Sequence, residues 1–385
     1  MTMKRKILLI LALSLLALLS FLFLNKKNYF VSQQETDYHD VFVGLLPKDQ
    51  GSELALFDPH KNQFTKIKSL PHVSPDNYAN ITKDGATIAY TTWDETGTKR
   101  YLVVEDVKSE KKDEYLKDRE GKYEVVSPSW FLDKKRILML RNDVSNSSAD
   151  QDIIILDVDS GKTMTLAKGG YWVLVKFDEQ DRKQFAMSQD ELDQLIEKYG
   201  GDRKIPLEEA GSKVFVKFSK PSLSRDNKRV TYSASLYRNA AKQGEGLVIA
   251  SSLWVVDLDT GKNKKIYSTK NKAMLGKATW GYDGASIAFV EYKDMTGENG
   301  KILTLDYTKP DSSLRTIIET TDQTYTNLDP FYIQEKEITF LSIPEGKSEK
   351  EATRFIQKMD NETREILDVQ LEGQKQLLRN FTFIQ

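Results

Sequence analysis

The sequence predicts an all-β fold, a β-propeller of six or seven four-stranded blades with six preferred, preceded by one N-terminal transmembrane helix. Two observations predict it. A pattern of turn and strand returns about every fifty residues along most of the chain, and an uncharged apolar segment stands at the N-terminus. Periods of about 40–50 residues with several strands each are typical of propeller blades.

The apolar segment is the first element. Residues 7–24 form a run of about 18 residues without a charge, which is long enough to cross the hydrocarbon core as a helix. The basic residues 4–6 precede it and Lys26 and Lys27 follow, so the positive-inside rule favours a cytoplasmic N-terminus. The run outlasts a signal-peptide core and no small-residue cleavage site follows, which favours a retained anchor.

These features divide the chain into three parts. We expect residues 1–27 to be a cytoplasmic tip and a transmembrane signal-anchor, and residues 28–40 to be a polar linker. Residues 41–385 would then be the propeller, with a helical insertion near 178–213. This arrangement predicts a single-pass protein of the cell membrane whose C-terminal domain is extracytoplasmic.

The first repeated element is a turn built on Asp-Gly or Asp-Asn, followed by a short strand of apolar and β-branched residues. Such turns accommodate positive φ angles and suit tight hairpins between antiparallel strands. The copies lie at residues 82–90, 130–140, 224–232 and 281–289, with a degenerate fifth copy at 333–340.

The second repeated element is an apolar strand that ends in Asp and runs into a polar turn. It lies at residues 102–106, 153–157, 253–257 and 302–306, with weaker relatives at 54–58 and 355–360. Two copies continue almost identically, as Asp-Val-Asp-Ser-Gly-Lys from Asp157 and Asp-Leu-Asp-Thr-Gly-Lys from Asp257. Together the two elements describe neighbouring strands of one antiparallel sheet.

The spacing of the first element sets the size of the unit. Asp84 and Asp133 lie about 49 residues apart, and Asp226 and Asp283 about 57, close to the length of a propeller blade. A four-stranded sheet has two apolar faces and must bury them against neighbours, which favours a closed ring.

One interval is roughly twice as long, about 93 residues from Asp133 to Asp226. Within it, residues 171–177 read as a strand and residues 188–199 as a helix that begins with a capping box. The stretch is either a degenerate blade with a helical insertion or an insertion between regular blades.

The first blade is one strand short. Residues 41–46, 54–57 and 64–67 supply three strands, and the C-terminal residues 379–384 could supply the fourth. Closing the ring with strands from both termini would remove the exposed sheet edges.

The composition restricts the chemistry. The 385 residues include 56 basic and 57 acidic ones, a formal net charge of −1, whereas a nucleic-acid partner normally requires a basic excess. The absence of cysteine excludes disulfides, Cys-ligated zinc and thiol catalysis, and three histidines make a His-rich metal site improbable. The sequence therefore predicts no cofactor, no metal and no nucleic-acid partner.

The two elements together resemble the TolB-like propeller repeats. The residues that carry the resemblance are Asp-Gly-x-x-Ile-Ala followed by Tyr90 or Phe289, and Leu-x-Val-Val-Asp-x-Asp-Thr-Gly-Lys from Leu253. Such repeats occur in periplasmic and cell-surface proteins and in the propeller domain of prolyl-oligopeptidase-type peptidases. The resemblance covers most of residues 41–385. It implies a six-bladed ring that binds a protein or peptide at its faces, and it transfers no catalytic residue.

No catalytic, cofactor-binding or metal-ligating residue stands out, and the binding residues are not defined. A peptidase would need a G-x-S-x-G pentapeptide and a following α/β domain, and the chain has neither. The Asp-x-Asp-x-Gly stretches from Asp157 and Asp257 resemble part of a calcium loop. Because Lys162 and Lys262 follow in place of further oxygen ligands, we expect hairpin turns there.

Tryptophans and charged stretches have ordinary structural explanations. Most tryptophans are expected in the cores between blades, with one or two near a loop as candidates for a binding face; they are Trp93, Trp130, Trp172, Trp254 and Trp280. The stretches 108–124 and 345–354 mix both signs of charge and are expected to be solvated outer hairpins, the second with a short helical turn.

Two functional hypotheses follow. The leading one is a non-enzymatic binding, scaffold or sensor module that the membrane holds through residues 7–24 and that binds an envelope protein, peptide or polymer. The alternative is an envelope hydrolase or lyase with carboxylates in the propeller channel. Carboxylates with raised pKa values in one deep channel would favour the alternative.

Overall fold

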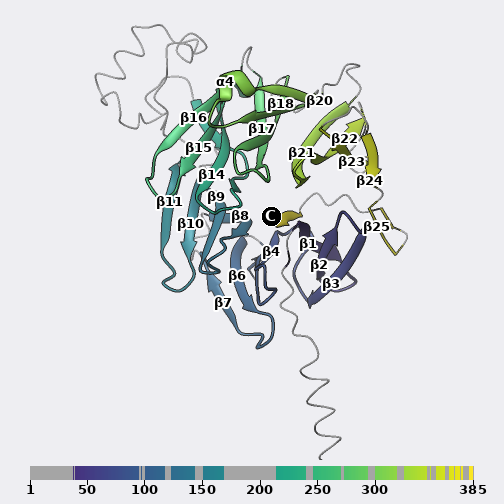
Figure 1. Cartoon of the computed structure of the whole chain (residues 1–385). Coiled ribbons are helices and arrows are strands. Elements are labelled where there is room, and N and C mark those ends of the chain that lie inside the picture. The colour runs from purple at the N-terminus through teal and green to yellow at the C-terminus, as the bar shows by residue number, and fades with distance from the viewer. Residues whose placement is uncertain are drawn as a thin grey trace, which may run out of the picture.

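Six antiparallel sheets surround a central axis in the computed structural model (Figure 1). The structure describes residues 38, 40–94, 97, 100–117, 123–143, 151–168, 214–239, 246–269, 273–293, 300–318, 325–344, 347, 353–359, 364–367, 369–372, 374–375 and 381–384. The expected anchor at residues 7–24 and the expected insertion near 178–213 lie outside these residues. None of the described helices combines the length and the apolar character that a membrane crossing requires.

The first three sheets are blades 1 to 3. Each is a sheet of four antiparallel strands, which are named below in order from the axis outward. Blade 1 contains β27 (Thr382–Ile384), β1 (Val41–Pro47), β2 (Ser52–Asp58) and β3 (Gln63–Leu70). Blade 2 contains β4 (Ala79–Ile81), β5 (Thr87–Trp93), β6 (Arg100–Asp106) and β7 (Lys112–Tyr115). Blade 3 contains β8 (Tyr123–Trp130), β9 (Arg136–Asp143), β10 (Gln151–Asp157) and β11 (Thr163–Lys168).

Blades 4 to 6 complete the ring. Blade 4 contains β12 (Val214–Phe218), β13 (Ser222–Leu223), β14 (Arg229–Asn239), β15 (Gly246–Asp257) and β16 (Asn263–Ser268), with β12 and β13 as two halves of its inner strand. Blade 5 contains β17 (Met274–Trp280), β18 (Ser286–Tyr292), β19 (Lys301–Asp306) and β20 (Arg315–Ile318). Blade 6 contains β21 (Tyr325–Gln334), β22 (Glu337–Pro344), β23 (Thr353–Lys358) and β24 (Arg364–Leu367).

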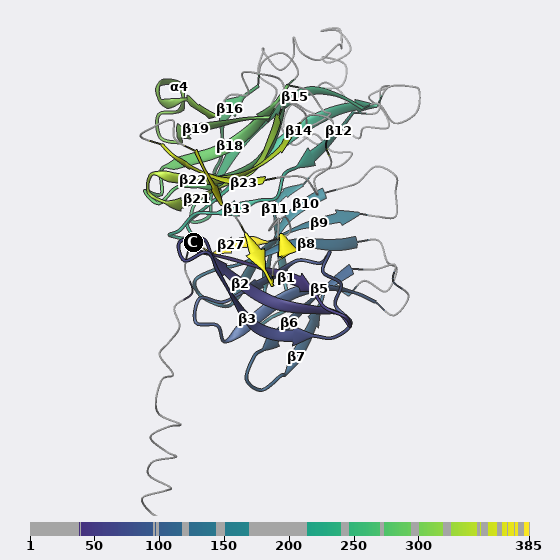
Figure 2. The same ribbon diagram turned by 90° about the vertical axis from the view of Figure 1, so that its right-hand side faces the viewer.

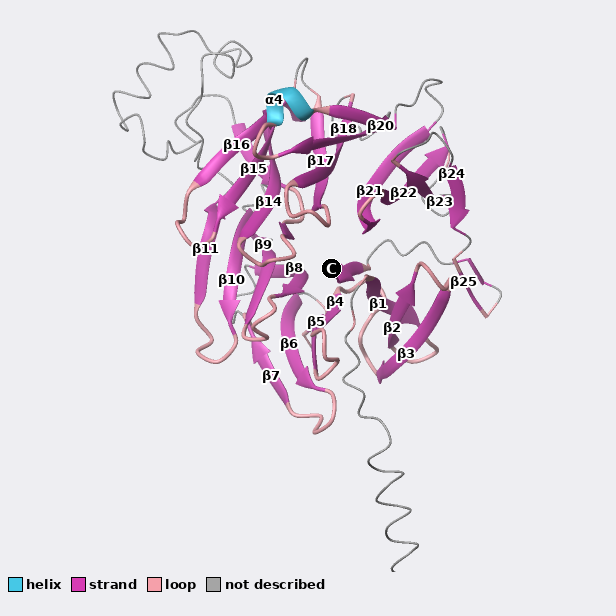
Figure 3. Cartoon of the chain, viewed as in Figure 1, coloured by secondary structure: helices cyan, strands magenta, loops and turns pink. Residues whose placement is uncertain are grey.

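Little else is described besides the blades. Figure 3 shows strands almost throughout, with the short helix α4 (Pro310–Ser313) between two strands of blade 5. A small hairpin of β25 (Gln370–Leu371) and β26 (Gln374–Lys375) lies outside the six sheets. The described residues therefore confirm the predicted all-β propeller and give it six blades.

Each pair of neighbouring blades buries its own hydrophobic core. Between blades 4 and 5, Leu253 and Val255 pack against Trp280 and Phe289. The remaining interfaces have equivalent clusters, including one between blades 6 and 1 that closes the ring. Burying one such side chain contributes roughly 1.5–3 kcal/mol. The sheets thus shield one another's apolar faces, as the repeat predicts.

The two termini of the propeller meet in blade 1. Strand β27 pairs antiparallel with β1, with Val41 opposite Ile384 and Val43 opposite Thr382, and the two strands lie side by side in Figure 2. The prediction that the C-terminal residues supply the missing strand is confirmed. The ring is closed by backbone hydrogen bonds as well as by side-chain packing.

The Asp-centred turns connect the first and second strands of the blades, and the ring face that carries them is called the turn face below. In blade 3, the Asp133 carboxylate accepts hydrogen bonds from the backbone N–H groups of Lys135 and Arg136, at 2.9 and 3.1 Å. In blades 2 and 5, Gly85 and Gly284 adopt φ angles of 70° and 64°, which glycine adopts without strain. These local bonds explain why the motif recurs.

The Asp157 and Asp257 stretches are hairpin turns, as predicted. The Asp157 carboxylate accepts hydrogen bonds from the backbone N–H and the hydroxyl of Ser160, at 2.8 and 2.6 Å. Asp257 and Thr260 repeat the pair at 2.8 and 2.7 Å. The carboxylates are therefore occupied by their own turns.

The structure describes the two blades on either side of the double-length interval. Residues of β8 to β11 share one core with β12 and β14, so blades 3 and 4 are direct neighbours. Residues 169–213, which connect the two blades in sequence, lie outside the described residues, as do the strand and the helix predicted within them.

The two charged stretches differ from the prediction. Lys111 and Lys112 do lie at the exposed outer strand of blade 2, but Glu124 belongs to β8, the inner strand of blade 3. The prediction for Arg354 is wrong, because this residue lies in β23 and is only 2% exposed. The alternating pattern of a strand placed it on a buried face, which its charge did not reveal.

Candidate functional site

A cavity of about 420 Å³ lies on the axis of the ring. All six blades contribute to its wall, through their innermost strands and the turns that follow them. Representative lining residues are Thr382 of blade 1, Asn80 of blade 2, Ser129 of blade 3, Ser222 of blade 4, Thr279 of blade 5 and Phe331 of blade 6. The cavity is therefore the central channel of the propeller.

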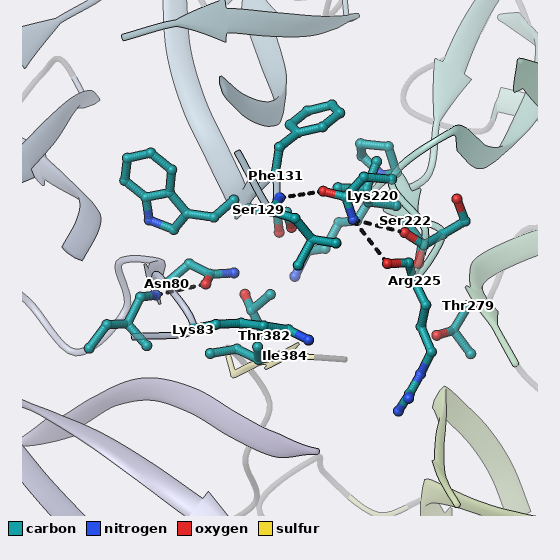
Figure 4. Close-up of a pocket in the computed structure, with 18 of the residues that line it drawn as sticks. Asn80, Lys83, Ser129, Phe131, Lys220, Ser222, Arg225, Thr279, Thr382 and Ile384 are labelled. Carbon is teal, nitrogen blue, oxygen red and sulfur yellow. Dashed lines mark hydrogen bonds between the residues drawn. The ribbon is translucent and has the colours of Figure 1, made fainter. Parts of the chain in front are cut away.

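Hydroxyl and amide side chains form the middle of the channel wall. Asn80, Ser129, Ser222, Thr279 and Thr382 occupy it, one from each of five blades. Figure 4 shows these side chains, from strands on opposite sides of the ring, around a common space. The Asn80 amide donates to the Pro128 carbonyl at 3.2 Å and accepts from the Ile81 N–H at 2.7 Å, which fixes its orientation. The hydroxyl groups of the wall can donate and accept hydrogen bonds, so they suit a polar group.

Below this level the inner strands bulge, at a place called the bulge position here. The pairing register skips from Val126 to Ser129 in blade 3, from Leu275 to Ala278 in blade 5, and from Leu328 to Phe331 in blade 6. A bulge leaves residues out of the ladder and turns them toward a new direction.

Proline explains two of these three register skips, in blades 3 and 6, and also the break between β12 and β13 in blade 4. Pro128, Pro221 and Pro330 stand within them and have no N–H to donate to the ladder. The residues before two of them, Ser127 and Asp329, have positive φ angles of 52° and 46°. The residues immediately before these prolines, with Lys277 in blade 5, occupy the bulge position.

Two lysines lie at the bulge position, and the space around them is called the deep end of the channel. Lys220 and Lys277 both line the cavity. The Nζ atom of Lys277 lies 3.6 Å from the centre of the Phe331 ring, and that of Lys220 lies 4.6 Å from the Tyr78 ring centre. The aromatic faces favour the charged amines at these places.

The electrostatics of the deep end are unusual. Burial lowers the pKa of Lys277 to about 7; the neighbouring charges of Lys220 and Arg354 act in the same direction, whereas Asp329 opposes them. Burial also lowers the pKa of Arg354 to about 10. Three cations and one carboxylate therefore share this region.

Arg354 stands behind the channel wall, between blades 6 and 1. Its Cζ atom lies 5.2 Å from the centre of the Phe42 ring. Within the described part of the chain its Nε, Nη1 and Nη2 atoms have no hydrogen-bond partner. A buried guanidinium without partners is rare, because its desolvation is not compensated.

At the other end, which is called the mouth, the cavity reaches the turn face. Two of the cations there are paired with carboxylates: Lys134 with Asp84 at 2.5 Å, and Arg225 with Asp40. Lys83 also lines the cavity there and forms no ion pair among the described residues. Burial alone would raise the pKa of Asp84, but hydrogen bonds from Lys134, Thr82 and the Ala86 backbone lower it to about 2. Two of the three lysine and arginine side chains at the mouth are therefore neutralised by carboxylates, whereas neither lysine of the deep end forms an ion pair with a described carboxylate.

The end of the linker is bound at the mouth. The Tyr38 N–H donates to the Lys83 carbonyl at 2.6 Å, and the Asp40 N–H donates to the Ile384 carbonyl at 2.7 Å. Through its side chain Asp40 also reaches Arg225 of blade 4. The chain therefore enters the propeller beside the cavity, at the turn face.

Sequence reasoning left the binding residues undefined. Of the tryptophans, Trp280 is a fully buried core residue as predicted, and Trp130 lines the cavity. That one or two tryptophans near a loop form a binding face stays a prediction. Trp172 lies outside the described residues. Lys220 and Lys277 were missed, although aligning the repeats would have placed both at the same position, six residues before the Asp of the Asp-centred element.

Metal ligands do not gather in the described residues. No three His, Asp or Glu side chains lie close enough together there to hold an ion. Asp84, which lines the cavity, is already paired with Lys134.

No protein-family model and no curated protein matches this chain. Solved structures do resemble it. They include TolB from Acinetobacter baumannii, with 15% identity, a TM-score of 0.41, and coverage of 85% of this chain and 68% of that one. An oligogalacturonate lyase in complex with manganese shares 9% identity at a TM-score of 0.49, covering 85% of this chain and 72% of the lyase.

The β-propeller domain of the Trilobed protease from Pyrococcus furiosus also resembles the chain, with 12% identity, a TM-score of 0.43 and coverage of 82% of each chain. TolB is thus among the similar structures, and the six sheets agree with the predicted six-bladed type. At such identities the likeness concerns the fold alone.

Proposed function

We propose that this protein is a membrane-anchored, extracytoplasmic propeller that binds a segment of an envelope protein, peptide or polymer in its central channel, without catalysing a reaction on it. The observation that carries the proposal is the cavity on the axis, to which every blade contributes. Concave sites that combine apolar walls with a few convergent polar groups are the usual places for ligands. Here Trp130, Leu223 and Ile384 supply apolar wall beside the ring of hydroxyl and amide groups.

The linker supports a particular orientation of the ring. Residues 7–24 are apolar enough to span a bilayer, and residues 28–37 could extend at most about 35 Å. Tyr38 and Asp40 are bound beside the mouth. An anchored chain would therefore hold the turn face and the mouth toward the membrane, where a ligand near the outer leaflet could reach them.

The alternative, an envelope hydrolase or lyase, needs carboxylates with separated roles in the channel. A general acid must keep its proton near neutral pH, which requires a raised pKa. Asp84 has the opposite property, since hydrogen bonds hold its pKa at about 2. The charges of the deep end are mainly cationic, which suits binding better than proton donation by a carboxylic acid.

The experiment is a retention assay with the full-length chain in detergent micelles and an extract of the cell envelope. Ser129→Trp should fill the channel, while Lys264→Trp places the same side chain on the exposed outer strand β16 as the matched control. We expect a component retained by the wild type and by Lys264→Trp but lost with Ser129→Trp. Retention that Ser129→Trp leaves unchanged would show that the channel is not the binding site.

A further inference from the structure

We infer that the deep end of the channel is an anion site, in which Lys220 and Lys277 bind a carboxylate or phosphate group of the ligand. The inference rests on the proposed function, since it names the chemistry of what the channel holds. Both lysines line the cavity, and they come from neighbouring blades. Their amines can each donate three hydrogen bonds to such a group.

The contrast between the two ends of the channel is the first argument. At the mouth, Lys134 and Arg225 are each paired with a carboxylate of the protein itself, and only Lys83 lines the cavity there without an ion pair among the described residues. Among the described residues no carboxylate forms an ion pair with Lys220 or Lys277. In the described part of the chain, Asp329 is the one carboxylate whose charge acts on Lys277, against the two cations Lys220 and Arg354. An anion from outside would restore the balance.

Arg354 gives the second argument, which is independent of the cavity wall. Its guanidinium is buried between blades 6 and 1 without a hydrogen-bond partner among the described residues, and its charge acts on Lys277. A charge in this position raises the electrostatic potential of the deep end without occupying it. Arg354 is thus a positioning residue, acting on the ligand through Lys277.

The hydroxyl groups above the lysines supply the third argument. Ser222 and Thr279 line the cavity at the level next to the bulge position, on the same two inner strands as the lysines. Oxygen atoms of an anion that the amines leave unbonded could accept hydrogen bonds from these hydroxyls. Phe331 closes the side of Lys277 that faces blade 6.

Proton uptake should accompany binding. The charged groups that act on Lys277 are Asp329 from β21, Lys220 from the loop before β13, and Arg354 from β23. Because the pKa of Lys277 is about 7 without ligand, an anion that favours its charged form must raise that pKa. Affinity for the anion should therefore fall as the pH rises through about 7 in the wild type.

The test uses the full-length chain in detergent micelles and two probes, inorganic phosphate and propane-1,2,3-tricarboxylate, each against chloride at equal ionic strength. Apparent dissociation constants come from the shift of the thermal unfolding midpoint. At pH 6 we expect at least one probe to stabilise the wild type, and the two probes separate a phosphate from a carboxylate ligand. Lys220→Met and Lys277→Met should each weaken binding about tenfold or more, because each removes a charged donor.

The matched control is Lys264→Met on the exposed strand β16, which should bind as the wild type does. Methionine keeps the length of the lysine stem and removes a poorly compensated charge, so neither channel variant should unfold below the wild-type midpoint without anion. Compared with the wild type for the same probe, Lys277→Met should also lose the part of the pH dependence near 7 that the amine contributes, whereas Lys220→Met should retain it. The proton equilibria of the probe itself are common to all variants and cancel in this comparison.

Absence of stabilisation by both probes at pH 6, or equal stabilisation of the two channel variants and the wild type, would overturn the anion site. If Ser129→Trp still abolishes retention of an envelope component in that case, the channel binds a ligand without an anionic group, and the proposed function stands. If the probes bind but no component depends on Ser129, the anion site stands and the proposed function is wrong.

Discussion

Two lysines and one carboxylate at the deep end of the channel, together with the uncharged Ser127, occupy one structural position in the repeat. Ser127, Lys220, Lys277 and Asp329 all lie where the inner strand leaves its ladder. A side chain at this place is not committed to the packing between blades, so its chemistry can vary without loss of the core. The fold thereby separates the residues that hold the blades together from those that face the axis.

Glycine has a different role at two equivalent turns. Gly85 and Gly284 have nearly the same positive φ, but a β-carbon on Gly85 would lie 2.6 Å from the Tyr38 ring, whereas one on Gly284 would meet nothing within 4 Å. Substitution by alanine should therefore cost about 1 kcal/mol of unfolding free energy at both sites because of φ. Gly85→Ala should lower the unfolding free energy further, because the added methyl group also displaces the Tyr38 ring.

The pair of variants can be compared by thermal unfolding and by limited proteolysis of the linker. We expect Gly284→Ala to leave cleavage near residues 28–40 unchanged and Gly85→Ala to accelerate it. Equal proteolysis of the two variants would show that Tyr38 does not hold the linker at the mouth.

At the scale of elements, strand β27 closes the ring. It provides the inner edge of blade 1, and Ile384 packs into the core between blades 1 and 2. In the other blades the inner strand directly precedes its neighbour in sequence, whereas β27 comes from the far end of the chain. Pairing β27 with β1 brings the two ends of the propeller together, which costs conformational entropy of the chain. The hydrogen bonds and packing of the closed edge must compensate for this cost.

Ending the chain after Phe381 removes β27 and should open the ring. The free energy of unfolding should fall by at least about 3 kcal/mol, from the lost burial of Ile384 and the lost hydrogen bonds to β1. Chemical denaturation measures the loss, and size-exclusion chromatography should show association through the freed edge of β1.

A chain that ends after Ile384 keeps the whole of β27 and is the control for this truncation. It should unfold like the full chain. Equal stability of the two truncated chains would mean that side-chain packing alone closes the propeller.

At the scale of the whole molecule, the topology in the membrane can be tested because the chain contains no cysteine. A single introduced cysteine is then the only thiol of the chain, and its labelling shows on which side of the membrane it lies. In intact cells a membrane-impermeant maleimide should label Lys162→Cys, on an exposed turn of blade 3, and should not label Thr2→Cys.

Labelling of both after the cells are permeabilised is the control for reactivity. Labelling of Thr2→Cys alone in intact cells would reverse the predicted orientation, and labelling of neither would place the propeller inside the cell.

The sequence by itself determined the repeat, and with it the fold. In Asp-centred turns such as that at Asp133, the carboxylate accepts hydrogen bonds from the backbone of the same turn. The strands that follow are rich in apolar residues and recur at a regular interval. Both features depend only on residues that are close in sequence, so a sequence pattern can predict them. The same reasoning supplied the strand contributed by the C-terminus, because a propeller blade that lacks one strand leaves an open edge.

Only the tertiary structure decided which charges meet. Lys220, Lys277 and Arg354 lie in three different blades and are far apart in the chain, and nothing local distinguishes them from solvated cations. Their neighbourhood depends on the closure of the ring, which brings inner strands from every blade to one axis and buries Arg354 between the last blade and the first. Electrostatic coupling acts through space, and the sequence records distance only along the chain.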